Sequence, residues 1–311
     1  MTPTLIVPSG STALVAMDTL VPKSGAIPSR LAVDLRATFG SVTPGQPPFA
    51  SIYPDTVDEQ LPSVPVVRKA VRVIAPPVAG GNWGNLNACC ILSPHRVLVG
   101  AAGQPVLPER YGIDFSRWDF ATKGFYSAEP PSLSNNLSYG AKLLAVANAT
   151  VVATSDDLPD QPPNVLPTGY TLAQETGNDI VLQLAPKVFA LYAHIQAGTV
   201  TVHVGQRVHT GQVLGLLGNS GNSSRPHLHF QLMDGPSPLT GNGLPFVFPS
   251  FTTVAVPNAA GDDLVALSRP LGHRNTYPLH DTVVRFSGPA TAGTAPAPEP
   301  LPSIPSAGPD D

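Results

Sequence analysis

Apolar and polar residues alternate over short stretches along most of this chain, and Gly, Asn or Pro closes nearly every stretch. Alternation with a period of two residues is typical of strands that bury one face, and the closing residues are typical of turns. The pattern is densest from about residue 139 onward, in the segments KLLAVANATVVAT, DIVLQLA, VFALYAHI, TVTVHVGQRV, QVLGLLG and HLHFQLM. The sequence therefore predicts a mainly β domain with antiparallel strands.

A weaker form of the same pattern occupies residues 4–75, in segments such as RLAVDLRATF that Pro, Gly and Ser separate. It predicts a small β-sandwich-like module over residues 1–78, too short for a complete sandwich and so possibly a truncated one. Turn-rich residues 79–108 then predict a linker, and residues 109–287 the main β domain. Residues 288–311 are rich in Pro, Ala and Gly and predict a disordered tail.

The composition argues against several kinds of partner. Only 12% of the residues are charged, while 37 Pro and 28 Gly favour strands and turns over long helices. A net charge of -4 gives no broad basic surface, so no nucleic acid is expected to bind. No apolar run approaches the ~18 residues of a transmembrane segment, and the first residues lack the features of a signal peptide.

The only two cysteines, Cys89 and Cys90, are adjacent in the sequence. A bridge between chain neighbours is strained, so no ordinary disulfide is expected. The pair is also weak evidence for a metal site, because no second cysteine pair accompanies it.

Two histidines stand one residue apart in the stretch RPHLHF, residues 225–230. Side chains at i and i+2 of a strand share a face, about 7 Å apart, so His227 and His229 would project together. Two neutral imidazoles on one face can serve one metal centre, one as a ligand and the other as a proton acceptor beside it. The alternative, in which one ring packs in the core and the other faces solvent, does not explain the shared face. The spacing favours a site.

A Tyr-x-His pattern at residues 192–194 precedes this His-x-His, and a Gly-rich turn, VGQRVHTGQVLG, separates the two. In this arrangement the sequence resembles the M23 family of zinc metalloendopeptidases, the lysostaphin or LytM type that cleaves peptidoglycan peptides. The resemblance covers roughly residues 109–250, and the run GQVLGLLGNSGNSSRPHLHF is its most specific part. It implies a lysostaphin-like antiparallel core with a duplicated hybrid motif, a Zn2+ cofactor, a peptidoglycan peptide as substrate, and a location in the cell envelope or outside the cell.

The resemblance also implies roles for individual residues. In this family a His-x-x-x-Asp motif supplies two zinc ligands, the second His of His-x-His supplies the third, and water takes the open position. By match to these motifs, Asp114 and His229 would bind the metal. His194 and His227 would act on the water and on the oxyanion.

The expected His-x-x-x-Asp stretch aligns with RYGID, where Arg110 stands in place of the first ligand histidine. A guanidinium stays protonated and has no lone pair to give, so it cannot bind zinc. Three interpretations remain open: His95 completes the site, or Asp114, His229 and waters hold zinc more weakly, or zinc is lost and Arg110 pairs with Asp114. RYGID together with ACCILSPHRV is similar to a subgroup of the family that carries Arg here and Ser-x-His-Arg after a Cys pair, which fits the first interpretation. A loop histidine that bonds to a backbone carbonyl explains His95 equally well, so its role stays open.

Two functions from different classes follow. The first is a zinc-dependent metalloendopeptidase that cuts peptidoglycan peptides with metal-activated water, with Tyr192 and Asn219 as candidate substrate contacts. The second is a degenerate, non-catalytic module that binds peptidoglycan or activates a partner hydrolase, as the missing histidine suggests. Retention of Asp114 and of the motif histidines favours the first, because a non-catalytic site would have little physical need for all of them.

Overall fold

The computed structural model describes residues 26–38, 56–66, 71–89, 93–101, 103–165, 168–169, 171 and 174–287. The chain divides into two compact units, a small one within Val15–Val71 and a large one that contains the chain from Arg72 onward. The tail expected over residues 288–311 lies outside the described residues.

The small unit contains two short antiparallel ladders. Strand β1 (Arg30–Leu31) pairs with β4 (Val64–Pro65), and β2 (Asp34–Thr38) pairs with β3 (Thr56–Gln60). These strands agree with the β character expected for the N-terminal region. Their arrangement as part of a sandwich stays a prediction.

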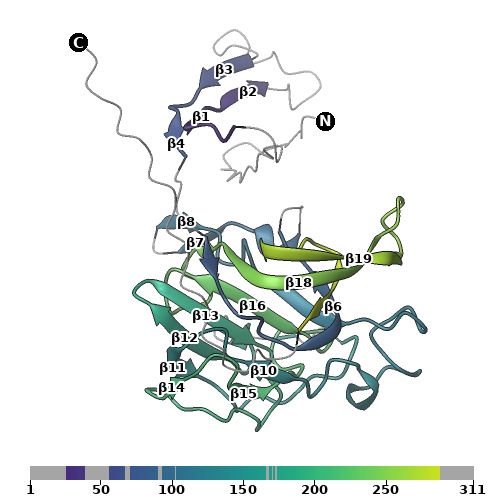
Figure 1. Ribbon diagram of the computed structural model, residues 1–311. Helices are drawn as coiled ribbons and strands as arrows, with labels where there is room; N and C mark the ends of the chain where they lie inside the picture. The colour runs from purple at the N-terminus through teal and green to yellow at the C-terminus, as the bar shows by residue number, and fades with distance from the viewer. Residues whose placement is uncertain are drawn as a thin grey trace, which may run out of the picture. The chain divides into compact units, whose positions relative to one another are not determined.

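A sheet of 12 strands organises the large unit (Figure 1). All of its strand pairs are antiparallel except one, between β5 (Arg72–Val73) and β18, so the expected antiparallel β class is confirmed. Strand β17 (Gly243–Leu244) pairs with β16 beside the main path. Along that path the order is β14 (Arg207–Val208), β11 (Ala149–Thr154), β12 (Ile180–Ala185), β13 (Val188–Ala193), β16 (Leu228–Met233), β9 (Ile113–Arg117), β6 (Gly80–Leu86), β20 (Val283–Phe286), β18 (Phe246–Pro257) and β19 (Leu264–Thr276).

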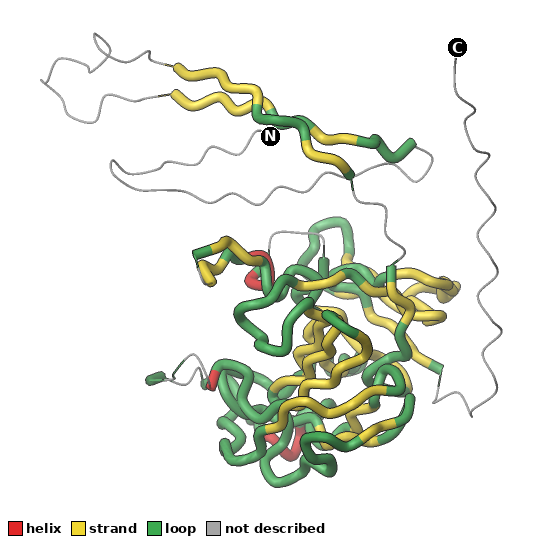
Figure 2. The backbone as a smooth tube through the Cα atoms, turned by 90° about the vertical axis from the view of Figure 1, so that its left-hand side faces the viewer, coloured by secondary structure: helices red, strands yellow, loops and turns green. Residues whose placement is uncertain are grey.

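Two more ladders complete the large unit, β10 (Lys142–Leu144) with β15 (Val213–Leu216), and β7 (Val99–Ala101) with β8 (Gln104–Val106). Helical residues in the described chain are confined to short 3-10 turns, including η2 (Pro94–Arg96) and η3 (Leu133–Asn135), as the tube view shows (Figure 2). No helix among the described residues has the length and apolar character needed to cross a membrane.

The three central strands β13, β16 and β9 pack one face into the large apolar core, and their other face carries polar side chains beside a second apolar cluster that includes Leu191 and Met233. Tyr192, Phe230 and Phe115 belong to the buried hydrophobic core, and burial of each such side chain stabilises the fold by about 1.5–3 kcal/mol. Because side chains alternate along a strand, the adjacent residues His229 and Asp114 project from the opposite face. The sheet thus places polar side chains above a tightly packed core.

The segment expected to be a linker, residues 79–108, contains strand β6, which lies between β9 and β20 inside the sheet. Its glycines allow close approach to both neighbours. A Cβ at Gly84 would lie 3.3 Å from the carbonyl oxygen of Ser116, and one at Gly81 would lie 3.0 Å from Nε of Arg285. The linker prediction is therefore wrong for this segment, because glycines that look like turn formers here permit strand contact.

Cys89, just after β6, is disulfide-bonded, contrary to the expectation from the sequence. Cys90, the other cysteine of the chain, lies outside the described residues. The backbone N–H of Cys89 donates to the hydroxyl of Tyr277 at 3.3 Å. This contact ties the end of β6 to the residue that follows β19.

Candidate active site

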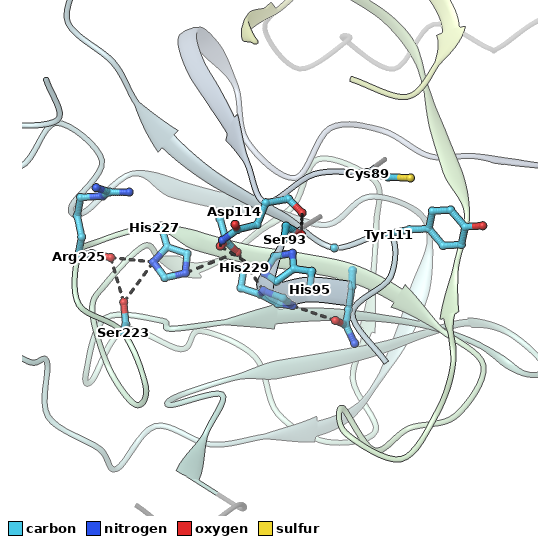
Figure 3. Close-up of polar contacts among 12 residues, drawn as sticks. Cys89, Ser93, His95, Tyr111, Asp114, Ser223, Arg225, His227 and His229 are labelled. Carbon is cyan, nitrogen blue, oxygen red and sulfur yellow. Dashed lines mark hydrogen bonds and ion pairs between the residues drawn. The ribbon is translucent and has the colours of Figure 1, made fainter. Parts of the chain in front are cut away.

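Three separate segments bring a buried carboxylate and two histidines together (Figure 3). Asp114 on β9 and His229 on β16 are direct partners in the antiparallel ladder, and His229 Nδ1 lies 3.0 Å from Asp114 Oδ1. His95 comes from the 3-10 turn η2, and its Nε2 lies 3.3 Å from the other carboxylate oxygen, Oδ2. The structure thus brings His95 to the two residues that the motifs had marked as ligands.

The geometry of this cluster fits a metal ion. One ligand atom from each of His95, Asp114 and His229 lies within 4.8 Å of the others. Ligands of a tetrahedral zinc, bound at about 2.0–2.2 Å, lie roughly 3.4 Å from one another, close to the two distances above. Two imidazoles and one carboxylate are also a ligand set typical of catalytic zinc sites with an open position. The cluster could therefore hold a metal ion.

Arg110 does not take over the site. Among the described residues, the side chains that contact the Asp114 carboxylate are those of His95, His227, His229 and Asn87. The Arg110 guanidinium instead lies 5.2 Å from the centre of the Tyr111 ring. The interpretation in which Arg110 pairs with Asp114 and fills a lost metal site is therefore wrong.

Gln231 fixes the orientation of His229, and the sequence analysis missed it. The Nε2 atom of His229 lies 2.9 Å from Gln231 Oε1, while the Gln231 amide nitrogen donates to the carbonyl of Pro238. Because an amide oxygen only accepts, His229 Nε2 must donate, and Nδ1 is left to face Asp114. Strand alternation could have identified Gln231, because it follows His229 at i+2 and therefore lies on the same face of β16.

Asn87 is a second residue that the sequence analysis missed. Its side-chain nitrogen donates to Asp114 Oδ2 at 2.7 Å. Asn87 has φ 53, in the left-handed region that asparagine tolerates better than most residues. No motif could have found it, because only the path of the chain after β6 brings it to β9.

His194 and His227 lie beside the cluster in matching orientations. Nδ1 of His194 lies 2.9 Å from the carbonyl oxygen of Ser220, and Nδ1 of His227 lies 2.7 Å from that of Arg225. Carbonyl oxygens only accept, so each Nδ1 donates and each Nε2 keeps its lone pair. The two rings are 4.6 Å apart, and His227 Nε2 lies 3.6 Å from Asp114 Oδ1. The structure thus places both histidines beside the cluster, each with its Nδ1 bonded to a backbone carbonyl.

Burial sets the protonation of these two histidines. It lowers the pKa of His194 well below the usual value of 6.5, and the positive charges of His227 and His229 act in the same direction. Burial also lowers the pKa of His227, although the Asp114 carboxylate opposes this shift. Both rings are therefore neutral near pH 7.

The pKa values of the central pair move the other way. Burial alone would raise the pKa of Asp114, but the nearby histidines, by charge and by hydrogen bonds, hold it well below its usual range. Burial would lower the pKa of His229, but its hydrogen bond to Asp114 and the charges of Glu109 and Asp114 raise it to about 9. In the metal-free protein, His229 therefore carries a proton that a metal ion at Nδ1 would replace.

Tyr192 does not reach this site. Its ring packs on Phe230 in the core, and its hydroxyl donates to the carbonyl of Leu144 and accepts from the N–H of Val146. The side chain is fully buried, which contradicts a substrate contact. Regular strand alternation would place Tyr192 on the face of His194, but β13 ends before His194, whose φ of 63 breaks the alternation.

Asn219 is also buried, and its side chain supports the loop before His227. Its nitrogen donates to the carbonyl of Gln161 at 2.8 Å, and its oxygen accepts from the Ser223 hydroxyl at 2.7 Å. Ser223 in turn lies 3.2 Å from His227 Nδ1. A direct substrate contact by Asn219 stays a prediction.

One comparison with known proteins finds a family for part of this chain. Residues 135–240 match the profile of peptidase family M23, which confirms the resemblance inferred from the Tyr-x-His and His-x-His motifs. The match begins after Asp114, so the subgroup with arginine at position 110 stays a prediction. No curated protein matches the chain.

Several solved structures are similar to part of this chain. The catalytic domain of lysostaphin from Staphylococcus simulans is 22% identical, with a TM-score of 0.28, over 53% of this chain and 86% of that one. The catalytic domain of a mutant of the prophage-encoded M23 protein EnpA from Enterococcus faecalis is 18% identical, with a TM-score of 0.32, over 53% and 92%. A zinc containing peptidase from Vibrio cholerae is 17% identical, with a TM-score of 0.32, over 56% and 41%.

Proposed function

We propose that this chain, whose residues 135–240 match peptidase family M23, is a zinc-dependent endopeptidase that hydrolyses peptide bonds of bacterial cell-wall peptidoglycan. The observation that carries the proposal is the convergence of His95, Asp114 and His229 in one buried cluster. His95 offers the imidazole that position 110 lacks. A peptidoglycan substrate would place the protein in the cell envelope or outside the cell, and this location is part of the proposal.

The metal would be held by His95 Nε2, a carboxylate oxygen of Asp114 and His229 Nδ1. When bound, zinc would lower the pKa of a water molecule to about 7 and polarise the scissile carbonyl. Gln231 keeps the His229 ring turned so that Nδ1 faces the cluster, and Asn87 holds the Asp114 carboxylate by Oδ2. These contacts fix the ligand atoms before any metal arrives.

His194 and His227 have complementary tasks in hydrolysis. Each presents an Nε2 lone pair, so together they can accept hydrogen bonds from both hydrogens of one attacking water. His227 is the better proton acceptor because Asp114, 3.6 Å away, stabilises its charged form. His227 would take the proton as the water attacks and pass it to the nitrogen of the leaving amine, while His194 holds the water in place.

Digestion of purified peptidoglycan by the zinc-loaded protein tests this function. Mass spectrometry of the soluble fragments identifies each new amino group and hence the bond cleaved. His227→Ala should retain zinc and lose about 10²–10⁴-fold in turnover, because it removes a proton acceptor and no ligand. His209→Ala, which removes an exposed histidine of the Gly-rich turn, serves as the matched control. Zinc-loaded protein that binds peptidoglycan and releases no fragment would instead support the non-catalytic module.

A further inference from the structure

Arg225 lies directly before the His-x-His strand, and the mechanism above makes no use of its guanidinium. Its backbone carbonyl accepts the hydrogen bond from His227 Nδ1, so the positions of the two residues are coupled. The guanidinium carbon lies 3.8 Å from the centre of the Phe125 ring, which is a close cation–π contact. Figure 3 shows the Arg225 side chain beside His227.

This guanidinium lacks an anionic partner. Among the described residues, no carboxylate forms an ion pair with Arg225, and its buried Nε bonds to no acceptor. A buried donor without a partner costs free energy, so the fold retains the Nε atom of Arg225 here at the expense of stability. The ligand that would remove this cost is an anion.

Two further buried side chains lie near Arg225. The hydroxyl of Tyr126, which follows Phe125, interacts with the side chain of Asn136, and the two backbones also form a bridge. The charge of Arg225 acts on Tyr126, which places the two side chains near each other. The loop that carries Phe125 and Tyr126 lines a cavity of about 250 Å³, to which Glu129 contributes and Arg225 does not. The cation–π contact with Phe125 therefore connects the guanidinium to this loop.

The group is also electrostatically coupled to the proposed catalytic residues. Arg225 lowers the pKa of His227, and the charge of Asp114 in turn raises the pKa of Arg225. Arg117 provides a contrast, because its guanidinium also stacks on an aromatic ring, that of Trp83 at 4.8 Å, and its Nε is also buried and unbonded. The backbone N–H of Arg117 donates to the Ser138 hydroxyl, whereas the backbone carbonyl of Arg225 accepts from His227 Nδ1. Arg225 is therefore the stacked arginine that is joined directly to a proposed catalytic residue.

We propose that Arg225 is a specificity-determining residue that binds a carboxylate of the substrate peptide, one or two residues from the scissile bond. A guanidinium and a carboxylate form two parallel, charge-assisted hydrogen bonds, which favour this anion over a neutral amide of the same shape. The carboxylate can belong to an acidic side chain or to a free C-terminus. The inference rests on the proposed function, since it names the substrate class of the same site.

Binding of matched peptides to the zinc-loaded His194→Ala variant, which should hold metal without turnover, tests this inference by calorimetry. One peptide sequence is prepared with glutamate, with glutamine, and with a free C-terminal carboxylate at each position near the candidate bond. At one position at least, a carboxylate peptide should bind about tenfold more tightly than its glutamine form. Adding Arg225→Gln should reduce that ratio to within about twofold, Arg225→Lys should retain part of it, and Arg117→Gln should leave it unchanged.

Two results would overturn the inference. One is equal binding of the glutamate, free-carboxylate and glutamine peptides at every position. The other is a loss of affinity in Arg225→Gln that is the same for all three peptides, which would mean that the stacked side chain only supports the loop. A carboxylate preference in binding without cleavage by the parent protein would retain this inference and reject the endopeptidase function. Cleavage without a preference would do the reverse.

Discussion

His229 and Asp114 face each other across the ladder between β16 and β9, with Nδ1 of one 3.0 Å from Oδ1 of the other. Their proximity is set by strand register, because a slip of one residue would turn one of the two side chains into the core. Backbone pairing thus positions the two central residues of the cluster. His95 is the exception, since it reaches them from a 3-10 turn outside the sheet.

Replacement of His95 by alanine should weaken zinc binding at least about 100-fold, because the cluster then retains only Asp114 and His229 as protein ligands. Elemental analysis and competition with a chromophoric chelator measure zinc content and affinity. His209→Ala should bind zinc as the parent protein does, since that histidine is exposed and is not part of the cluster. Unchanged zinc affinity in His95→Ala would show that Asp114, His229 and water hold the ion without it.

Replacement of Gln231 by leucine should lower zinc affinity by about 10–100-fold without removing a ligand, because His229 Nε2 loses the acceptor that orients the ring. The buried donor left without a partner should also cost about 1–3 kcal/mol of the free energy of unfolding. Gln231→Glu retains an acceptor at this place and is the matched control. Equal zinc dissociation constants in the leucine and glutamate variants would show that Gln231 does not orient His229.

The metal-free protein should be most stable near pH 6.5. Below pH 6.5, the lowered pKa values of His194 and His227 mean that the folded state binds protons more weakly than the unfolded chain does. Stability therefore decreases as the pH is lowered. Above pH 6.5, the raised pKa of His229 means that the folded state holds a proton more tightly than the unfolded chain, so stability is lost as pH rises through about 9.

Urea unfolding across this pH range, with and without zinc, measures the effect. Zinc replaces the proton on His229 Nδ1, so the zinc-loaded protein should not show the alkaline loss that His229 causes. A metal-free protein whose stability is flat between about pH 6.5 and 9 would contradict the assigned protonation of His229.

Replacement of Tyr192 by phenylalanine should destabilise the fold by about 1–3 kcal/mol, because the Leu144 carbonyl and the Val146 N–H lose their shared partner in the core. Turnover should stay within about twofold of the parent protein at a temperature where both are folded. Urea unfolding and steady-state kinetics measure the two effects. A large loss of turnover at unchanged stability would instead indicate that the Tyr192 hydroxyl contacts the substrate.

The sequence marked the parts of this site that lie on regular strands. The resemblance to family M23 implied His229 and Asp114 as metal ligands, and the structure pairs these two residues across β16 and β9. Strand alternation failed for Tyr192 and His194, because the backbone leaves the strand conformation at His194. Alternation applies only while the strand continues, and the sequence does not mark that end.

Contacts between distant segments set the limit of prediction. His95 was one of three open interpretations, and only the path from β6 into η2 brings it to Asp114. Strand β6 itself was mistaken for a linker because Gly81 and Gly84 look like turn residues. In the sheet these two glycines allow residues of β20 and β9 to approach β6 closely, and those residues are remote in sequence.

The candidate metal cluster and the M23 match do not coincide along the chain. Residues 135–240 include His194, His227 and His229, whereas Asp114 and His95 precede the match. A graft of the matched segment onto another scaffold would therefore carry proton acceptors and a single ligand, an incomplete module. Any fragment meant to work as a transferable catalytic cassette must begin no later than β6, the strand that leads the chain to Asn87 and His95.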